Sequence, residues 1–180
     1  MSVSLDGLFA GPDGDLGWQL ISEELHSFFN QHLAGMGAFL EGRMTYELMA
    51  SHWPTADEDP DNPQPVKEFA RIWREMPKIV YSRTLEHAGW NTTIVRDVAV
   101  EEVEALKAAP GGDLVIGGGD LDATFLRLGL VDELWLYVHP VVLGRGRPLF
   151  PAGLPLQLEL VATRAFANGV VLLCYRSATG

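Results

Sequence analysis

The sequence predicts an α/β fold with a mixed, mainly parallel sheet, helices on both of its faces and a C-terminal antiparallel hairpin. Short apolar segments alternate with helical segments from about residue 20 to residue 130, a pattern typical of parallel strands joined by helices. Further on, two apolar segments flank Asn168-Gly169, a dipeptide typical of a tight turn between antiparallel strands. The chain has 180 residues, the usual length of one domain, and residues 1–180 are expected to form a single domain.

The order of the elements follows from the spacing of apolar residues. The first helix is expected to begin near residue 22, with Ser22 as N-cap before Glu23 and Glu24. The other predicted helices cover residues 43–52, 66–76, a segment capped by Asp97, and 121–128. Strands are predicted where short apolar runs end at turn-forming residues: 37–42, 78–82, 92–96, 114–116, 132–142, 156–166 and 170–177.

The segment 51–65 interrupts this alternation. It contains prolines and acidic residues at close spacing, which disfavour regular structure. It is expected to form a mobile loop, and a lid over a site is one role open to such a loop.

Composition excludes several classes of function. Thirteen basic residues stand against 24 acidic ones, and this net charge of −11 opposes binding to nucleic acid. Cys174 is the only cysteine, which excludes an internal disulfide and a cysteine-rich metal cluster. The five histidines share no spacing typical of metal ligands, so no metal site is expected. The chain has no apolar run of membrane-spanning length and no basic leader, and a cytoplasmic location is expected.

Three predicted strand ends carry residues that suit an anion. In an open α/β sheet, ligands bind beyond the carboxyl ends of the strands. Gly117-Gly118-Gly119 stands between a strand and a helix, where bare backbone amides can approach a diphosphate. Asp122 occupies the place of the third glycine of a dinucleotide fingerprint, which weakens that interpretation and leaves a plain turn open.

The other two strand ends add cations and hydroxyl groups. Gly42, Arg43 and Thr45 follow one strand, and Ser82 and Arg83 follow the next. A guanidinium and neighbouring hydroxyls can bind phosphate oxygens. Taken singly, each residue is better explained as a cap or a solvated charge, but together they place cations and hydroxyl groups at strand ends in an acidic chain.

The order of five motifs resembles a known family. SLDGLFAGPDG, EGRMTYE, KIVYSRT, VIGGGDL and DELWLYVHPVVLGRGRPLF occur in the order typical of the dihydrofolate reductase-like superfamily, and most closely of its RibD C-terminal reductase branch. The resemblance covers nearly the whole chain and implies a three-layer α/β/α fold that uses NADPH. It also implies that Gly42, Arg43 and Thr45 serve cofactor phosphates, that Ser82 and Arg83 lie near the 2′-phosphate, and that residues 117–119 hold the diphosphate.

The same resemblance nominates substrate and catalytic residues. Trp18 and Glu23 have the spacing of a loop tryptophan and a helix-start acid that contacts the pterin in dihydrofolate reductases. Such an acid could orient a heterocycle and help to protonate a ring nitrogen if burial raises its pKa. A favourable charge in the first helical turn is the alternative for Glu23. Asp6 in the SLDG motif is the competing catalytic candidate, and an Asx-turn is its alternative.

Three further residues are implied on the substrate side. Tyr137 aligns with a strand position that faces the substrate in the folate enzymes, although a core position would also explain it. Gly144 and Arg145 belong to a glycine loop that lies next to the active site in the family. A cation there could meet a phosphorylated substrate or could simply solubilise a turn.

The resemblance implies an NADPH-dependent reductase that transfers a hydride to a pyrimidine- or pteridine-like heterocycle. The activity it implies first is 5-amino-6-(5-phosphoribosylamino)uracil reduction in riboflavin biosynthesis. Dihydrofolate reduction and a non-catalytic NADPH-binding module stay open as alternatives. A homodimer is expected from the family and from the apolar residues 134–142 and 148–156.

Overall fold

The computed structural model describes residues 1–177, and these residues form two compact units. The central unit comprises residues 25–121, and the terminal unit comprises residues 1–24 together with the chain from residue 122 onward. The prediction of one domain over residues 1–180 includes residues 178–180, which lie outside the described part. Helices α1 (Glu23–Leu33) and α5 (Gly119–Arg127) each contribute residues to both units.

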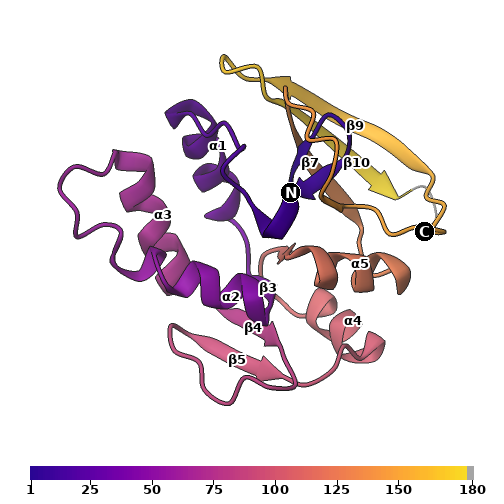
Figure 1. The fold of residues 1–180 in the computed structure, drawn as a ribbon. Helices are drawn as coiled ribbons and strands as arrows, with labels where there is room; N and C mark the ends of the chain where they lie inside the picture. Colours follow the sequence, from indigo (N-terminus) through magenta and orange to yellow (C-terminus); the bar gives the residue numbers. More distant parts are fainter. Residues whose placement is uncertain (178–180) are drawn as a thin grey trace. The chain divides into compact units, whose positions relative to one another are not determined.

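The central unit is built on a sheet of four parallel strands in the order β5-β4-β3-β6, of which β5, β4 and β3 are labelled in Figure 1. These strands are β3 (Ala38–Gly42), β4 (Lys78–Tyr81), β5 (Thr92–Val95) and β6 (Leu114–Gly117). The connections carry α2 (Arg43–Ala50), the short helix η2 (Trp53–Thr55), α3 (Gln64–Glu75) and α4 (Val100–Ala108). Parallel strands need such crossovers, which confirms the predicted alternation of strands and helices.

Apolar side chains from strands and helices meet in the core of the central unit. Trp73 of α3 is fully buried and belongs to one cluster with Tyr46 of α2, Phe39 of β3 and Val80 of β4. The register pairs Phe39 with Lys78 and, two residues further along each strand, Glu41 with Val80, so all four side chains share a face of the sheet. Packing against this face fixes α2 and α3 to the strands whose ends carry the candidate site.

Two buried groups of opposite charge, Glu41 and Lys78, act on each other within this core. Lys78 is 1% exposed, and its ammonium donates to the carbonyls of Met76 (2.7 Å) and Trp90 (2.8 Å) and lies 4.3 Å from the centroid of the Trp73 ring. Burial raises the pKa of Glu41 to about 7, while the positive charge of Lys78 opposes that rise. Burial likewise lowers the pKa of Lys78 to about 8, opposed by Glu41. Each charge therefore depends on the other for its stability in the core.

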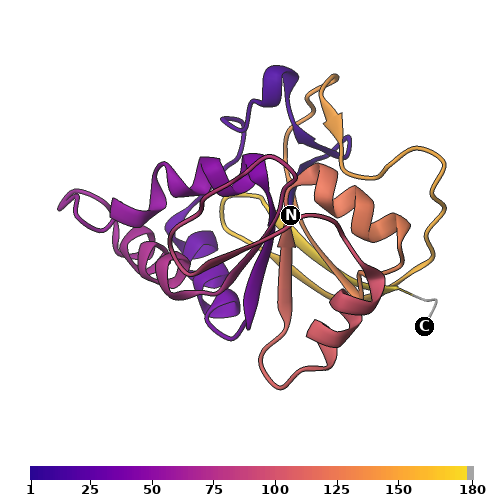
Figure 2. The same ribbon diagram turned by 90° about the horizontal axis from the view of Figure 1, so that it is seen from below.

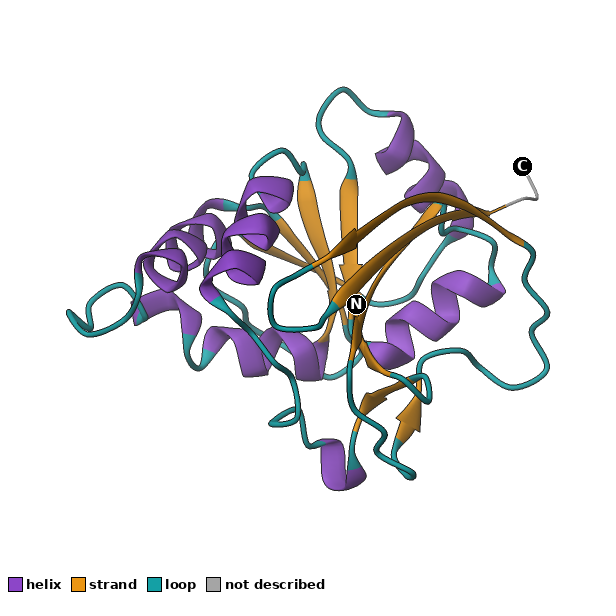
Figure 3. Cartoon of the chain, turned by 90° about the horizontal axis from the view of Figure 1, so that it is seen from above, coloured by secondary structure: helices purple, strands orange, loops and turns teal. Residues whose placement is uncertain are grey.

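The terminal unit contains a sheet of mixed direction with the order β1-β7-β10-β9. Its strands are among those drawn in orange in Figure 3. β1 (Ser2–Ser4) runs parallel to β7 (Glu133–His139), whereas β10 (Val171–Ser177) runs antiparallel to both β7 and β9 (Leu158–Ala165). A second, two-stranded sheet pairs β2 (Leu8–Ala10) with β8 (Arg147–Pro148) (Figure 2). The β9–β10 turn contains Gly169 at φ +85°, which confirms the predicted hairpin.

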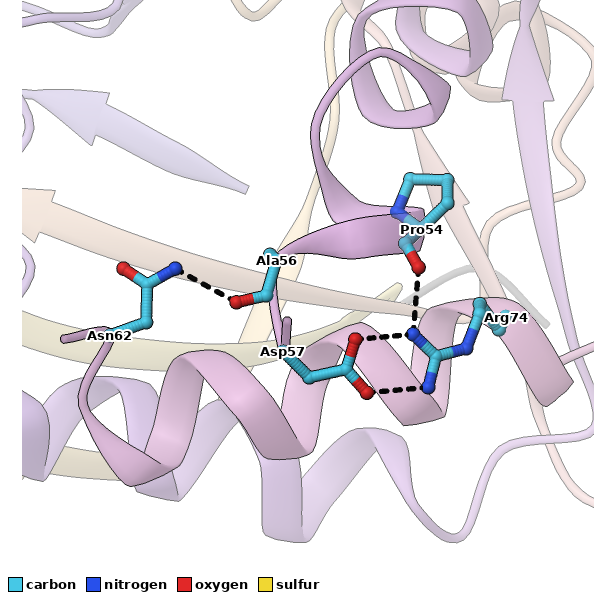
Figure 4. A network of polar contacts seen from close by, with 5 residues as sticks. All are labelled: Pro54, Ala56, Asp57, Asn62 and Arg74. Atoms are coloured by element: carbon cyan, nitrogen blue, oxygen red, sulfur yellow. Dashed lines mark hydrogen bonds and ion pairs between the residues drawn. The ribbon is translucent and has the colours of Figure 1, made fainter. Parts of the chain in front are cut away.

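Two local predictions need correction. The segment 51–65 contains regular structure, the short helix η2 and the start of α3. Arg74 of α3 also contacts it, with a bidentate ion pair to Asp57 (2.6 and 2.6 Å) and a bond to the Pro54 carbonyl (Figure 4). Asn62 closes the segment on itself by donating to the Ala56 carbonyl (2.8 Å). A charged residue of α3, which lies well beyond the segment in the sequence, thus supplies the order that local composition disfavours.

The second correction concerns the start of α4. This helix begins at Val100 after Ala99, with no side-chain cap, so Asp97 does not cap it. Asp97 instead pairs with Arg83.

Candidate functional site

The carboxyl ends of three strands meet at one edge of the sheet in the central unit. Gly42 at the end of β3 is paired with Tyr81 of β4, and Glu41 is paired with Gly117 at the end of β6. The three segments nominated from the sequence, 42–45, 82–83 and 117–119, therefore follow neighbouring strands. Register alone brings them together, because parallel strands end at the same edge.

Gly118 makes the closest approach within this group. A Cβ atom there would lie 2.4 Å from Thr45 Oγ1, and the residue has φ +115°, a backbone conformation that favours glycine. α2 begins directly after Gly42 without a side-chain cap, which leaves its first amides available to an external acceptor. Bare amides, a hydroxyl and two helix starts thus lie at this edge, and these are groups of the kind that bind a diphosphate such as that of NADPH.

Both nominated arginines are exposed and already have acidic partners. Arg43 donates to Glu47 at 2.8 Å, with side-chain exposures of 44% and 46%. Arg83 is paired with Asp97, with exposures of 80% and 64%. Exposed pairs of this kind are weak, so a phosphate can take over either guanidinium at small cost.

Ser82 has a different role from the neighbouring arginine. It is 7% exposed, and its hydroxyl accepts hydrogen bonds from the amides of Thr84 (3.2 Å) and Leu85 (2.9 Å). The Ser82 side chain therefore shapes the turn that presents Arg83.

Asp6 in the terminal unit holds the glycine loop after β7. Its carboxylate accepts from the amides of Leu143 (3.1 Å) and Gly144 (2.8 Å) and from the Ser4 hydroxyl (2.6 Å). These bonds, led by the one from Ser4, lower the pKa of Asp6 to about 2. Asp6 is therefore ionised at neutral pH and fixes the loop that carries Arg145, whose side chain is exposed.

The other substrate-side candidates also lie in the terminal unit. Tyr137 is 2% exposed, its ring centroid lies 6.5 Å from that of Phe166, and burial raises the pKa of its phenol. Glu23 is exposed in the first turn of α1, whereas its neighbour Glu24 accepts from Arg164 and from the Ala167 amide. The chain itself does not bury Glu23, so only a bound ligand could supply the burial that a proton donor there requires.

His139 was not nominated from the sequence, yet it holds the loop that carries Trp18. It is fully buried at the end of β7, and its Nδ1 accepts from the Leu20 amide at 3.0 Å. The Trp18 ring meets it edge-on, with centroids 5.3 Å apart, and burial lowers the pKa of the imidazole. His139 and Tyr137 are two residues apart in β7 and therefore lie on the same face of the strand. This spacing is the sequence signal that could have identified His139.

Other classes of site find no support in the described residues. None of the helices within residues 1–177 has the length and apolar composition that a membrane span needs. In the same part of the chain, no three His, Cys, Asp or Glu side chains gather in a way that could hold a metal ion.

Comparison with known proteins places this arrangement among described folds. The chain is similar to a dihydrofolate reductase of Enterococcus faecalis solved with NADP(H), with a TM-score of 0.63, 19% identity and coverage of 98% of this chain and 93% of that one. It is also similar to the diaminohydroxyphosphoribosylaminopyrimidine deaminase/5-amino-6-(5-phosphoribosylamino)uracil reductase of Thermotoga maritima, with a TM-score of 0.65 and 19% identity. That match covers 98% of this chain and 55% of the other, and both likenesses show a dihydrofolate reductase-like α/β fold.

Sequence comparison identifies the family. The uncharacterized protein YyaP of Bacillus subtilis (strain 168) is 37% identical over 177 residues, which cover 97% of this chain and 91% of the relative. The family model described as the RibD C-terminal domain matches residues 1–172. The resemblance drawn from the five motifs is thereby confirmed, and the chain belongs to the RibD C-terminal domain family.

Proposed function

We propose that this chain is an NADPH-dependent reductase acting on a pyrimidine- or pteridine-like heterocycle. The observation that carries the proposal is the meeting of residues 42–45, 82–83 and 117–119 at one edge of the parallel sheet. Membership of a family named for a riboflavin-pathway protein and a fold shared with dihydrofolate reductases support it. Bound NADPH would supply the hydride, and the protein needs to contribute position, charge and exclusion of water.

Each segment has a distinct part in binding the cofactor. The amides of residues 117–119 and the uncapped start of α2 receive the diphosphate. Thr45 offers its hydroxyl, while Arg43 and Arg83 offer charge-assisted hydrogen bonds to the remaining phosphate oxygens. Ser82 keeps the turn before Arg83 in shape.

The substrate would be held by residues of the terminal unit. Asp6 fixes the loop of Gly144 and Arg145, and the cation of Arg145 suits a phosphorylated sugar. Trp18 is half-buried and offers aromatic surface to a heterocycle. Tyr137 is buried, which favours the alternative of a core position for it. Reduction of 5-amino-6-(5-phosphoribosylamino)uracil or a related ribosylated pyrimidine fits these groups, with dihydrofolate as the second candidate and the cytoplasm as the place of action.

NADPH is expected to bind more tightly than NADH. Replacing Arg43 by alanine should weaken NADPH binding by about ten- to a hundredfold, since a charge-assisted bond contributes about 1.5–3 kcal/mol. Calorimetric titration of both cofactors measures this. Lys107→Ala is the matched control, because Lys107 is also a cation paired with an acid, Glu104, but lies on α4. Equal dissociation constants for NADPH and NADH in the wild type would contradict the proposal.

The two acidic candidates are expected to differ in their substrates. Glu23→Gln should retain NADPH binding and lower the turnover of dihydrofolate by about a hundredfold, most severely near neutral pH where proton donors are scarce. Asp6→Asn should loosen the loop at residues 143–144 and impair a ribosylated pyrimidine more than dihydrofolate. Steady-state rates with both substrates test this, with Glu24→Gln as the neighbouring control. Unchanged dihydrofolate turnover in Glu23→Gln, or none in the wild type, would reject the folate role.

The alternative to an enzyme is a non-catalytic module that binds NADPH. Glu23 is exposed, and this argues against a proton donor for dihydrofolate at that position. With respect to folate, the exposure of Glu23 therefore favours the non-catalytic module. Oxidation of NADPH across a panel of pteridines and ribosylated pyrimidines separates the two functions. Binding without consumption of NADPH in every case would establish the module.

The chain is further expected to form a homodimer. Within residues 134–142, Leu134 and Leu136 are buried, but Val142 is 67% exposed, and Phe150 of residues 148–156 is 37% exposed. Strand β9 adds Leu160 and Val161, which are 51% and 49% exposed. Light scattering at micromolar concentration should give about twice the mass of one chain. A mass near that of one chain would refute the dimer.

A further inference from the structure

One exposed ion pair, between Arg83 and Asp97, lies at the proposed cofactor edge. Arg83 donates from Nε (2.8 Å) and from Nη2 to the same oxygen of Asp97, Oδ1. Both side chains are largely exposed, at 80% and 64%. A planar guanidinium edge and an acid are thus presented together to whatever binds beyond β4 and β5.

The backbone around the pair is held by other bonds. Tyr81 of β4 is paired with Val95 of β5, so Arg83 and Asp97 each stand two residues beyond the last matched pair. Arg96 donates to the carbonyls of Ser82 (2.9 Å) and Leu85 (2.7 Å), and this fixes the turn that contains Arg83. The side chains of Arg83 and Asp97 can therefore exchange partners without unfolding the turn.

We propose that Asp97 sets how strongly the protein distinguishes NADPH from NADH. This inference rests on the proposed function, in which Arg83 meets the 2′-phosphate. Asp97 occupies the Nε–Nη2 edge of Arg83 and must give it up to a phosphate, whose negative charge it also repels. When the phosphate is absent, the same carboxylate can accept hydrogen bonds from the ribose hydroxyls, as acids at strand ends do for NADH in other α/β folds.

The two side chains therefore favour opposite cofactors. Arg83 attracts the phosphorylated ribose, and Asp97 favours the ribose that carries only hydroxyls. The wild type discriminates less than Arg83 alone would, and neutralising Asp97 should reveal the full preference. Because the pair is exposed and screened by water, the shift is modest, about three- to tenfold in the ratio of dissociation constants.

Binding measurements on the intact protein test the role of Asp97. Calorimetric titration gives the ratio of the NADH and NADPH dissociation constants for the wild type, Asp97→Asn, Arg83→Gln and the double variant. Asp97→Asn is expected to raise this ratio and Arg83→Gln to lower it. In the double variant, the competition for the guanidinium is gone, so the effect of Asp97→Asn should shrink. Adenosine 2′,5′-bisphosphate and adenosine 5′-monophosphate should repeat the trend, because they isolate the ribose end from the nicotinamide.

Glu104→Gln is the matched control for charge. It removes one negative charge and the acidic partner of Lys107 on the same unit, but leaves the sheet edge intact, and it should not change the ratio. Thermal unfolding confirms that Asp97→Asn is folded, as expected for an exposed residue. If the ratio is unchanged or lowered in Asp97→Asn while Arg83→Gln weakens NADPH binding, the role proposed for Asp97 is wrong and the proposed function stands. A wild type that binds neither cofactor overturns the proposed function and this inference together.

Discussion

Replacing Lys78 by alanine is expected to lower the free energy of unfolding by about 3–5 kcal/mol, a large part of the stability of a domain of this size. The ammonium is buried, and its removal leaves the carbonyls of Met76 and Trp90 without their donor and Glu41 without its counter-charge. Urea unfolding at equilibrium measures the loss. Lys107→Ala, which removes a cation from the Lys107–Glu104 pair on α4, should cost no more than about 1 kcal/mol.

The loss should depend on pH in a defined direction. In the wild type, the pKa of Glu41 is about 7 in the folded state, above its ordinary value of 4.5, so folding retains a proton there that the unfolded chain releases. Without Lys78 that pKa rises further, and the folded state is destabilised over a wider range as pH increases. The difference between wild type and Lys78→Ala should therefore be larger at about pH 8.5 than at about pH 6.

A double variant separates charge from packing. Lys78→Met combined with Glu41→Leu removes both charges and keeps apolar volume, and it should recover most of the lost stability. If Lys78→Ala has the same free energy of unfolding as the wild type at both pH values, Lys78 and Glu41 do not stabilise the fold as described.

Gly118→Ala is expected to weaken NADPH binding by about ten- to a hundredfold. The new Cβ would meet Thr45 Oγ1 at 2.4 Å, and alanine disfavours φ +115°, so the backbone at the proposed diphosphate site must move. Fluorescence or calorimetric titration of NADPH measures the effect. The thermal midpoint of the variant shows whether the fold is retained.

Gly89→Ala provides the control for this substitution. Gly89 has no atom within 4 Å of an added Cβ and needs no positive φ, so alanine there should leave NADPH affinity unchanged. Wild-type affinity in Gly118→Ala would exclude this glycine from the cofactor site.

Much of the candidate site can be predicted from the amino-acid sequence alone. Gly42, Arg43, Ser82 and Gly118 follow short apolar strands in the sequence, and parallel strands place their carboxyl ends at one edge. The hairpin at residue 169 can also be predicted from the sequence, because its turn depends on two adjacent residues. The cofactor itself is implied only by the resemblance of five motifs, since anion-binding residues do not distinguish one diphosphate from another.

Long-range contacts explain what the sequence conceals. Asp57 lies among residues typical of a mobile loop, yet Arg74 of a later helix holds it. The composition of a segment indicates only its local structural preference. It does not predict a partner 17 positions away in the sequence. The prediction of Asp97 as a helix cap is wrong for the same reason, because its partner is Arg83 on the neighbouring strand end.

The sequence by itself determined the order of strands and helices, the hairpin and the residue types at the strand ends, because these depend on local spacing and turn chemistry. Only the tertiary structure decided which charges are partnered and which are buried. Lys78 begins an apolar strand, and the fold buries it over the Trp73 ring, where the charge of Glu41 acts on it. Pairing and burial depend on which residues the fold brings together in space, and desolvation then sets the charge that each group can carry.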